Sequence, residues 1–367
     1  MKVLFVFGTR PEGIKMAPII KEIEKRKDLE SYTCVTGQHR EMLDQVLEIF
    51  DIEPDYDLNI FKKGQSLTDV TTKTLLGLED ILDELKPDIL LVQGDTTTVF
   101  AAALSAFYKK IKIGHVEAGL RSGNLYSPYP EEANRKLTGV LSNYHFAPTE
   151  SNRQNLLREG YDDKNIFITG NTVIDALKYS VKEDFLFDDE ILNNLDYNKD
   201  VVLLTAHRRE NWGEPMENIF SAIRQVVLER ENIEIVFPIH LNPIVRNTAK
   251  KYFSDLDRVH LIEPLSYLPF SNLMARVKFV VTDSGGVQEE APALGKPVLV
   301  LRNETERMEG VEAKTAKLAG TKSQDVYDSI ISLLDDKNLY EEMAKAVNPY
   351  GDGHAAKKIV DILEKMN

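Results

Sequence analysis

Residues 282–290 read Thr-Asp-Ser-Gly-Gly-Val-Gln-Glu-Glu and directly follow the apolar run Phe279–Val281. An apolar run, two glycines and a helix-forming stretch are typical of a strand that turns into a helix whose bare backbone N–H groups face an anion. Ser284 can cap this helix, and Gly285-Gly286 leaves room for a phosphate. Glu290 would follow one turn later, where a carboxylate can bind a ribose diol. The stretch predicts a nucleotide-phosphate site, with an ordinary strand-to-helix turn as the plainer alternative.

The composition is that of a globular protein with room for two cores. The chain has 367 residues, 43% of them hydrophobic and 28% charged, which suffices for two domains. The net charge of −14 argues against general binding to nucleic acid or anionic membranes, because such binding needs clustered cations. Cys34 is the only cysteine, so no intramolecular disulfide or thiolate metal cluster is expected. The chain shows neither a signal-peptide pattern nor an apolar run of about 18 residues, which favours a cytoplasmic protein.

Short apolar runs alternate with longer amphipathic ones, the pattern of βα units that build parallel sheets. The expected strands are Val3–Phe7, Tyr32–Thr36, Ile89–Gln93, Ile113–Glu117, Tyr144–Ala147 and Ile166–Thr169 in the first half, and Val201–Ala206, Ile233–Ile239, Val259–Ile262, Phe279–Thr282 and Pro297–Leu301 in the second. The acidic stretch 182–200 interrupts the alternation. The pattern predicts an α/β protein with two Rossmann-like, doubly wound domains, 1–182 and 200–367, facing a central cleft, with the terminal helices able to pack back on the first domain.

Charged residues follow two expected strands of the first half. Arg10 and Lys15 lie just after the first strand, where a guanidinium fork and an ammonium group suit a diphosphate or an enolic oxygen. A solvated Lys15 is the plainer alternative. Asp95 follows Ile89–Gln93, and it either faces the cleft or caps the next helix.

Further carboxylates follow in the same half. Glu117 ends an apolar strand, which is costly unless the carboxylate is paired or used. Glu131 and Glu132 stand at a helix start defined by Pro130, where one of them is expected only to interact with the helix dipole.

The second half supplies a histidine. His207 follows the strand Val201–Thr205 and precedes Arg208 and Arg209, an arrangement suited to a phosphate or to proton transfer. His240 also follows a strand but can equally be a core histidine, and His115 lies within a strand and is expected to be structural. Carboxylates from one half, with a histidine and a phosphate cradle from the other, predict proton transfer on a nucleotide-activated substrate.

These residues fall within motifs of one known family. The motifs are Gly8–Glu12, Gln38–Val46, Gly94–Thr98, His115–Arg121, Tyr129–Arg135, Thr169–Leu177, Ala206–Glu210, Thr282–Glu290 and Asn348–Gly353. From the first strand to the last helix, the chain resembles the non-hydrolysing UDP-N-acetylglucosamine 2-epimerases of bacteria and archaea. The resemblance implies the glycosyltransferase-B architecture, usually as a homodimer, with no nicotinamide and no required metal.

The resemblance also implies a reaction. UDP-N-acetylglucosamine and UDP-N-acetylmannosamine interconvert through loss of UDP, a 2-acetamidoglucal and re-addition of UDP, for precursors of cell-surface polysaccharides. Three alternatives stay open: a hydrolysing relative that releases N-acetylmannosamine and UDP, a 2-epimerase of a related UDP-N-acetylhexosamine, and a sugar-nucleotide sensor without turnover.

The resemblance also assigns the family's site residues to the matching positions of this chain. The implied acid/base and cleft-ordering residues are Asp95, Glu117, Glu131 and His207. The implied substrate-binding residues are Arg10, Lys15, Leu265, Phe270, Ser284, Gly285, Gly286, Glu290 and Arg307, together with Asp95, Glu117 and His207. Activation by a second substrate molecule is implied at positions that include Gln38, Gln65, Glu131, Arg208 and His240. The chain departs from the family at Met308, in place of a usual proline, and at Lys314, in place of a common glycine, which leaves the preferred N-acetylated sugar open.

Overall fold

The computed structural model describes residues 1–37 and 40–366 and comprises two compact units. Unit 1 is Met1–Tyr179 together with the chain from Tyr350 onward, and unit 2 is Ser180–Pro349. The last helix of the chain, α16 (Ala355–Met366), therefore belongs to unit 1, where it packs on α1 (Arg10–Ile23). The stretch 182–200 belongs to unit 2 and contains the short helix α8 (Glu190–Asn194).

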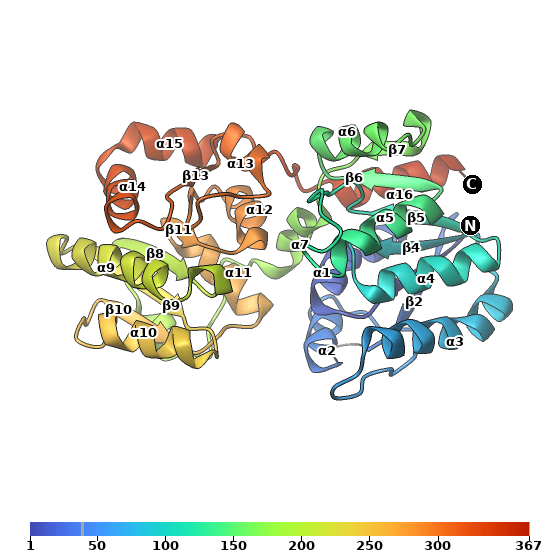
Figure 1. Ribbon diagram of the computed structural model, residues 1–367, viewed down its shortest axis with the longest axis horizontal. Helices are drawn as coiled ribbons and strands as arrows, with labels where there is room; N and C mark the ends of the chain where they lie inside the picture. Colours follow the sequence, from blue (N-terminus) through green and yellow to red (C-terminus); the bar gives the residue numbers. More distant parts are fainter. Residues whose placement is uncertain (38–39, 367) are drawn as a thin grey trace. The chain divides into compact units, whose positions relative to one another are not determined.

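Unit 1 is built on a seven-stranded parallel sheet in the order β3-β2-β1-β4-β5-β6-β7 (Figure 1). Its strands are β1 (Lys2–Phe7), β2 (Glu30–Val35), β3 (Tyr56–Asp57), β4 (Ile89–Gln93), β5 (Lys112–Val116), β6 (Tyr144–Ala147) and β7 (Ile166–Ile168). The connecting helices are α2 (Arg40–Ile49), α3 (Leu67–Leu85), α4 (Thr97–Tyr108), α5 (Glu131–Leu141), α6 (Glu150–Arg158) and α7 (Thr172–Ser180). In β1, the residues from Val3 to Phe7 are fully buried, because helices cover both faces of a doubly wound sheet.

Unit 2 repeats this winding on six parallel strands in the order β10-β9-β8-β11-β12-β13. They are β8 (Asp200–Thr205), β9 (Ile233–Pro238), β10 (Val259–Ile262), β11 (Phe279–Thr282), β12 (Val298–Val300) and β13 (Ala316–Leu318). The helices are α9 (Glu214–Glu229), α10 (Pro243–Phe253), α11 (Tyr267–Arg276), α12 (Gly285–Ala293), α13 (Met308–Glu312), α14 (Ser323–Asp335) and α15 (Lys337–Lys345), and a single 3₁₀ turn covers Arg209–Asn211. The predicted α/β class with two parallel, doubly wound sheets is confirmed.

Every strand predicted from the sequence is present, and no predicted end differs from the observed one by more than two residues. The sequence did not predict β3 or β13, which are edge strands of two and three residues. Their short runs carry little hydrophobic pattern, and they exist because a neighbouring strand offers its backbone hydrogen bonds.

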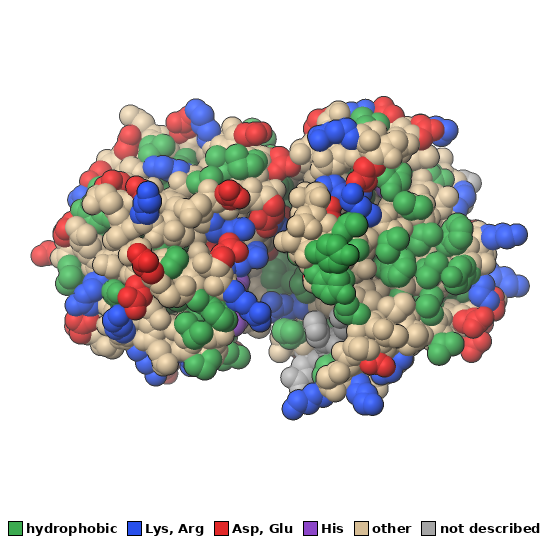
Figure 2. All heavy atoms as spheres, viewed as in Figure 1, with side chains coloured by type: hydrophobic (Ala, Val, Ile, Leu, Met, Phe, Trp, Pro, Cys, Tyr) green, Lys and Arg blue, Asp and Glu red, His purple; other side chains and the backbone are tan. Residues whose placement is uncertain are grey.

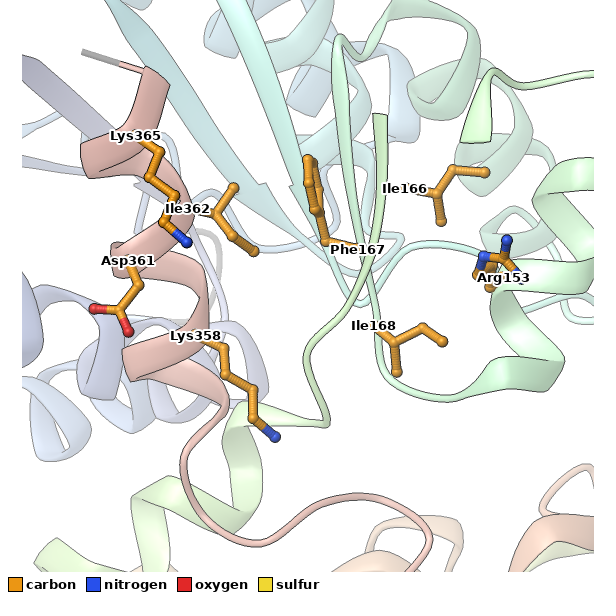
Figure 3. A pocket seen from close by; sticks show the side chains of 8 residues that line it. All are labelled: Arg153, Ile166, Phe167, Ile168, Lys358, Asp361, Ile362 and Lys365. Atoms are coloured by element: carbon orange, nitrogen blue, oxygen red, sulfur yellow. The ribbon is translucent and has the colours of Figure 1, made fainter. Parts of the chain in front are cut away.

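The β7 edge of unit 1 borders a hollow of about 450 Å³ (Figure 3). Figure 3 shows the strand residues Phe167 and Ile168 between Arg153 of α6 and the helix α16, which contributes Lys358 and Lys365 among others. A three-residue edge flanked by cations is a poor template for pairing with another chain. None of the site residues predicted from the sequence lines this hollow.

Candidate active site

Two of the predicted site residues of unit 1, Arg10 and Asp95, stand at its topological switch point. From β1 the chain proceeds to β2 on one side, whereas β4 lies on the other side of β1, so the loops that follow β1 and β4 diverge. Arg10 follows β1 as the first residue of α1, and Asp95 follows β4. Ligands of doubly wound sheets bind in the crevice at this position.

Glu12 joins the two loops of this switch point. Its carboxylate is 2% exposed and accepts hydrogen bonds from the backbone N–H groups of Gly8 (2.8 Å) and Thr9 (2.7 Å) and from the hydroxyl of Thr96. Burial raises the pKa of Glu12, and these hydrogen bonds oppose that rise. Glu12 thus holds the loops of Arg10 and Asp95 together, a role that was not predicted from its motif in the sequence.

Glu117 directly follows β5 with a backbone φ of 63°, the left-handed region that residues with a side chain rarely adopt. Such a backbone costs on the order of 1–2 kcal/mol and is typical of functional positions. Oε2 of Glu117 lies 2.5 Å from Nζ of Lys15 and also accepts a hydrogen bond from the side chain of Gln93. Lys15 is therefore ion-paired, and its predicted solvated alternative is wrong.

Asp95 is paired with a cation as well. Its Oδ2 atom accepts hydrogen bonds from the guanidinium of Arg135, at 2.8 Å from Nε and 2.7 Å from Nη2. Asn134 donates to the backbone carbonyl of Asp95 at 2.9 Å. The helix that follows is capped by Thr96, which accepts from the N–H of Val99, so the capping alternative for Asp95 is wrong.

The adjacent carboxylates Glu131 and Glu132 differ in their surroundings. Glu132 is fully buried, accepts hydrogen bonds from the N–H groups of Ser122 and Gly123, and pairs with Arg135. It is thus part of the scaffold. Glu131 begins α5, and its Oε2 atom is buried without a hydrogen-bond partner among the described residues. An unsatisfied buried carboxylate oxygen is uncommon, and of these two glutamates Glu131 is the one that has it.

The two histidines of this sheet are structural. His115 in β5 donates from Nε2 to the carbonyl of Gly94 (2.7 Å), which fixes the loop before Asp95. Burial lowers the pKa of His115 to about 4 and that of His145 in β6 to about 3, so both rings are neutral at pH 7. Cys34 is buried in β2, and burial raises its pKa to about 12.

The switch point of unit 2 carries the predicted histidine and the predicted phosphate cradle side by side in the sheet. β8 and β11 are neighbours, and His207 follows β8 while Ser284 follows β11. Between them lies Asp283, whose carboxylate accepts hydrogen bonds from the N–H groups of His207 and Arg208. The rings of His207 and His240 are stacked, with centroids 5.6 Å apart. His240 is exposed, so it is not a core histidine.

The cradle itself is the N-terminus of α12. Ser284 occupies the N-cap position, but its side chain makes no capping hydrogen bond, so the predicted cap is wrong. Its N–H group donates instead to Oγ1 of Thr282 (2.9 Å). A Cβ atom on Gly286 would meet nothing closer than Oε1 of Glu290 at 3.6 Å, so open space adjoins the first helical turn.

Gly285 has a different reason to be glycine. A Cβ atom there would lie 2.5 Å from Nη1 of Arg307. The guanidinium of Arg307 is held by Glu289 (2.7 Å) and Glu306 (2.5 Å). Burial alone would raise the pKa of Glu306, but Arg307 and Arg302 lower it to about 2. The predicted residues Leu265 and Phe270 are half-buried, one before α11 and the other within it.

The two departures from the family pattern adjoin this region in the chain. Met308 begins α13 and is 44% exposed. Lys314 has a φ of 62°, a conformation that favours glycine, and its ammonium group pairs with Glu342 of α15 at 2.6 Å. The added charge is therefore partly neutralised by α15.

Comparison with known proteins places the chain in a family. The family model described as UDP-N-acetylglucosamine 2-epimerase matches residues 21–364. The Bacillus subtilis UDP-N-acetylglucosamine 2-epimerase is 55% identical over 363 residues, covering 99% of this chain and 95% of the relative. A crystal structure of the Neisseria meningitidis enzyme bound to UDP-GlcNAc superposes with a TM-score of 0.89 at 52% identity, over the full length of both chains. The chain belongs to the UDP-N-acetylglucosamine 2-epimerase family.

Archaeal members of the epimerase family are also similar. The Methanocaldococcus jannaschii UDP-GlcNAc 2-epimerase is 36% identical with a TM-score of 0.86, over the full length of both chains. The family assignment made from the sequence is thus confirmed across distant relatives.

The residues expected from the family to bind an activating substrate are distributed over both units. Gln65, before α3, accepts a hydrogen bond from the N–H group of Lys62. Arg208 and His240 lie in unit 2, and the Nε atom of Arg208 is buried without a hydrogen-bond partner among the described residues. Gln38 lies outside the described residues.

Residues 1–37 and 40–366 contain no helix with both the length and the apolar character of a membrane-spanning segment. Nor does that part of the chain place three or more His, Cys, Asp or Glu side chains where they could hold a metal ion.

Proposed function

We propose that this protein catalyses the reversible 2-epimerisation of UDP-N-acetylglucosamine to UDP-N-acetylmannosamine without hydrolysis, as a cytoplasmic enzyme that supplies precursors of cell-surface polysaccharides. The proposal rests on the groups that follow the strands of the two sheets. In unit 1, Asp95 after β4 and Glu117 after β5 are each paired with a cation, and Glu131 at the start of α5 has an unsatisfied oxygen. In unit 2, an imidazole follows β8, next to the open N-terminus of α12. Epimerisation through elimination needs both kinds of group.

The chemistry divides into two halves. A base removes the C2 proton as the anomeric C–O bond breaks, so the C2–H electron pair forms the C1=C2 bond of 2-acetamidoglucal and UDP leaves with the C–O electron pair. UDP then adds back to C1, and an acid returns a proton to the opposite face of C2. The C2 proton is weakly acidic, so the step depends on placed acid/base groups on both faces. The leaving diphosphate requires a preorganised positive site.

Roles follow from this division. Asp95, Glu117, Glu131 and His207 are the proposed acid/base and ordering groups, and Arg10 and Lys15 stabilise negative charge on the diphosphate or the intermediate. Ser284, Gly285 and Gly286 bind the diphosphate at the N-terminus of α12, since the first N–H groups of a helix attract anions. Glu290 binds the ribose, and Leu265, Phe270 and Arg307 complete the nucleotide site.

A product analysis tests the proposal. Incubation with UDP-N-acetylglucosamine should yield UDP-N-acetylmannosamine up to a constant ratio, with ¹H and ³¹P NMR showing no free sugar and no net release of UDP. Accumulation of free N-acetylmannosamine and UDP would establish the hydrolysing alternative. Binding without turnover would establish the sensor, and turnover of only another UDP-N-acetylhexosamine would move the substrate assignment to that sugar.

We further propose activation by a second substrate molecule at Gln38, Gln65, Glu131, Arg208 and His240. Gln65 belongs to unit 1, and Arg208 and His240 belong to unit 2. A ligand activates when it binds the active arrangement more tightly than the inactive one. The buried, unsatisfied Nε of Arg208 supports this assignment, because a second anionic ligand would supply its acceptor.

A homodimer is the proposed assembly, formed through the helical layer of α3, α4 and α5. This layer exposes large hydrophobic side chains: Leu76, Phe107, Tyr108, Leu137 and Val140. Figure 2 shows hydrophobic side chains gathered over α4 and α5. Contiguous apolar patches of this kind mark interaction surfaces, and most oligomers pair identical patches about a two-fold axis. Val140, 74% exposed, is the point to test: Val140→Asp should convert a dimer to a monomer in sedimentation velocity.

A further inference from the structure

Asp283 is a fully buried carboxylate at the end of β11. Its Oδ2 atom accepts three hydrogen bonds, from the N–H groups of His207 and Arg208 (2.8 Å each) and from the side chain of Asn211 (3.1 Å). A carboxylate that is held in this way by backbone donors has a fixed orientation. Its second oxygen therefore points in a fixed direction.

That second oxygen faces the imidazole of His207. Oδ1 is buried, accepts no hydrogen bond from the described part of the chain, and lies 3.2 Å from Nδ1 of His207. Catalytic hydrogen bonds are often long before a substrate binds, so this distance suits a contact that tightens later. The His207 side chain is 38% exposed, which leaves Nε2 as the ring nitrogen available to a ligand.

We propose that Asp283 is a positioning residue that holds the His207 imidazole in the Nδ1–H tautomer, so that Nε2 is the atom that exchanges the proton with the substrate. The proposal rests on the proposed role of His207 in the reaction. When Nε2 accepts a proton, the ring becomes an imidazolium and Asp283 remains ionised, stabilising that charge without taking the proton itself. When Nε2 returns the proton, the same tautomer is restored.

The other groups that face His207 make control of its tautomer necessary. Burial lowers the pKa of His207; Asp283 opposes that effect, and Arg208 and His240 lower the pKa further. The free ring is then neutral, and a neutral imidazole in water favours its proton on Nε2, the atom that has to accept one. A buried acceptor at Nδ1 reverses that preference.

The tautomer can be read directly by NMR of protein labelled with ¹⁵N-histidine, without substrate. The chain has seven histidines, so the His207 signals are identified by their loss in His207→Gln. We expect the proton of His207 on Nδ1 at pH 7.5. A proton on Nε2 in the unaltered protein overturns the proposal.

The substitution Asp283→Asn makes the sharper test, because the backbone dictates how the amide must lie. The N–H groups of His207 and Arg208 and the side chain of Asn211 all need an acceptor, so the amide oxygen takes the place of Oδ2 and the NH₂ group faces Nδ1. Nδ1 must then accept, and the proton moves to Nε2. We expect this tautomer in Asp283→Asn, with turnover lowered on the order of 10³–10⁴-fold and UDP affinity within about threefold of the unaltered protein.

Asn211→Ala is the matched control, since it removes one hydrogen bond from Oδ2 but keeps the carboxylate. It should retain the Nδ1–H tautomer and lose less than about tenfold in turnover. A rate near normal in folded Asp283→Asn, or an Nε2–H tautomer in Asn211→Ala, contradicts the proposal. If Asp283→Asn does not fold, the tautomers of the unaltered protein and of Asn211→Ala decide. Normal turnover of His207→Gln, with the Nδ1–H tautomer present in the unaltered protein, would instead refute the proposed role of His207 and leave the tautomer assignment standing.

Discussion

Nζ of Lys15 lies 2.5 Å from Oε2 of Glu117, although the two residues are 102 positions apart in the chain. The pair joins the first turns of α1 to the end of β5. The cation is 17% exposed and the carboxylate 9%, so the attraction between them is only weakly screened by water. Together with the left-handed backbone of Glu117, the pair fixes a carboxylate at the sheet edge where the site is proposed.

Glu117→Gln should leave the fold intact and lower turnover by a factor on the order of 10²–10⁴, the usual range for loss of general acid/base help. The amide keeps the shape of the side chain but can neither accept a proton nor pair with Lys15. Asp95→Asn should behave similarly, because the carboxylate paired with Arg135 becomes neutral. Initial rates on variants with normal circular dichroism test this, and a near-normal rate in both would remove these carboxylates from the reaction.

Gly286 and Gly285 should respond differently to an added methyl group. Gly286→Ala fits within the folded chain, where the new Cβ would meet only Glu290 at 3.6 Å, and the helix position favours alanine. We expect unchanged or slightly higher stability with UDP affinity lowered by about tenfold, and a larger loss for Gly286→Val. Gly285→Ala should instead displace Arg307 and reduce stability. Calorimetry with UDP and thermal unfolding separate the two effects, and full UDP affinity in Gly286→Val would refute the cradle.

Unit 1 should lose stability in mild acid because of His115 and His145. Their folded-state pKa values, lowered by burial to about 4 and about 3, lie below the unfolded value of 6.5. The unfolded chain therefore binds more protons below pH 6.5, and the stability from the neutral rings is complete above pH 6.5 and lost as the pH falls towards 4. The loss from His115 alone is on the order of 3 kcal/mol. Urea unfolding between pH 7.5 and 4.5 measures it.

His145→Phe is the control for this pH dependence. It keeps a ring against Tyr161, whose centroid lies 4.7 Å from that of His145, and removes one titrating group. The slope of unfolding free energy against pH should become shallower between pH 6.5 and 4.5. An unchanged slope would assign the acid sensitivity to other groups.

Activation by a second substrate molecule predicts a sigmoidal dependence of rate on UDP-N-acetylglucosamine. The reverse reaction should be slow until a little UDP-N-acetylglucosamine is added, because only the activating ligand stabilises the active arrangement. Arg208→Ala should make the forward curve less sigmoidal. Hyperbolic kinetics in both directions for the unaltered protein would rule out the activating site.

The local sequence pattern was sufficient to predict those features that depend on a single segment of the chain. The strand runs, the glycine pair that begins α12 and the carboxylates after β4 and β5 follow from hydrophobic alternation and from the polar residues that interrupt it. Glu12, Glu132 and Asp283 could not be assigned in this way. Each is a buried carboxylate with at least one donor from another loop, the hydroxyl of Thr96 for Glu12 and backbone N–H groups for Glu132 and Asp283. Only the tertiary fold brings these donors to the carboxylates. The packing of α16 in unit 1 depends likewise on contacts far apart in sequence.

The most direct test of the account is hydrogen exchange at C2 of the sugar. The protein is incubated with UDP-N-acetylglucosamine in deuterated water, and both epimers are examined by NMR. Removal and return of the C2 proton through solvent-exchanging groups predicts deuterium at C2 of UDP-N-acetylglucosamine and of UDP-N-acetylmannosamine, with the nucleotide still attached. Epimers that interconvert while the C2 hydrogen is fully retained would contradict proton transfer by Asp95, Glu117, Glu131 and His207.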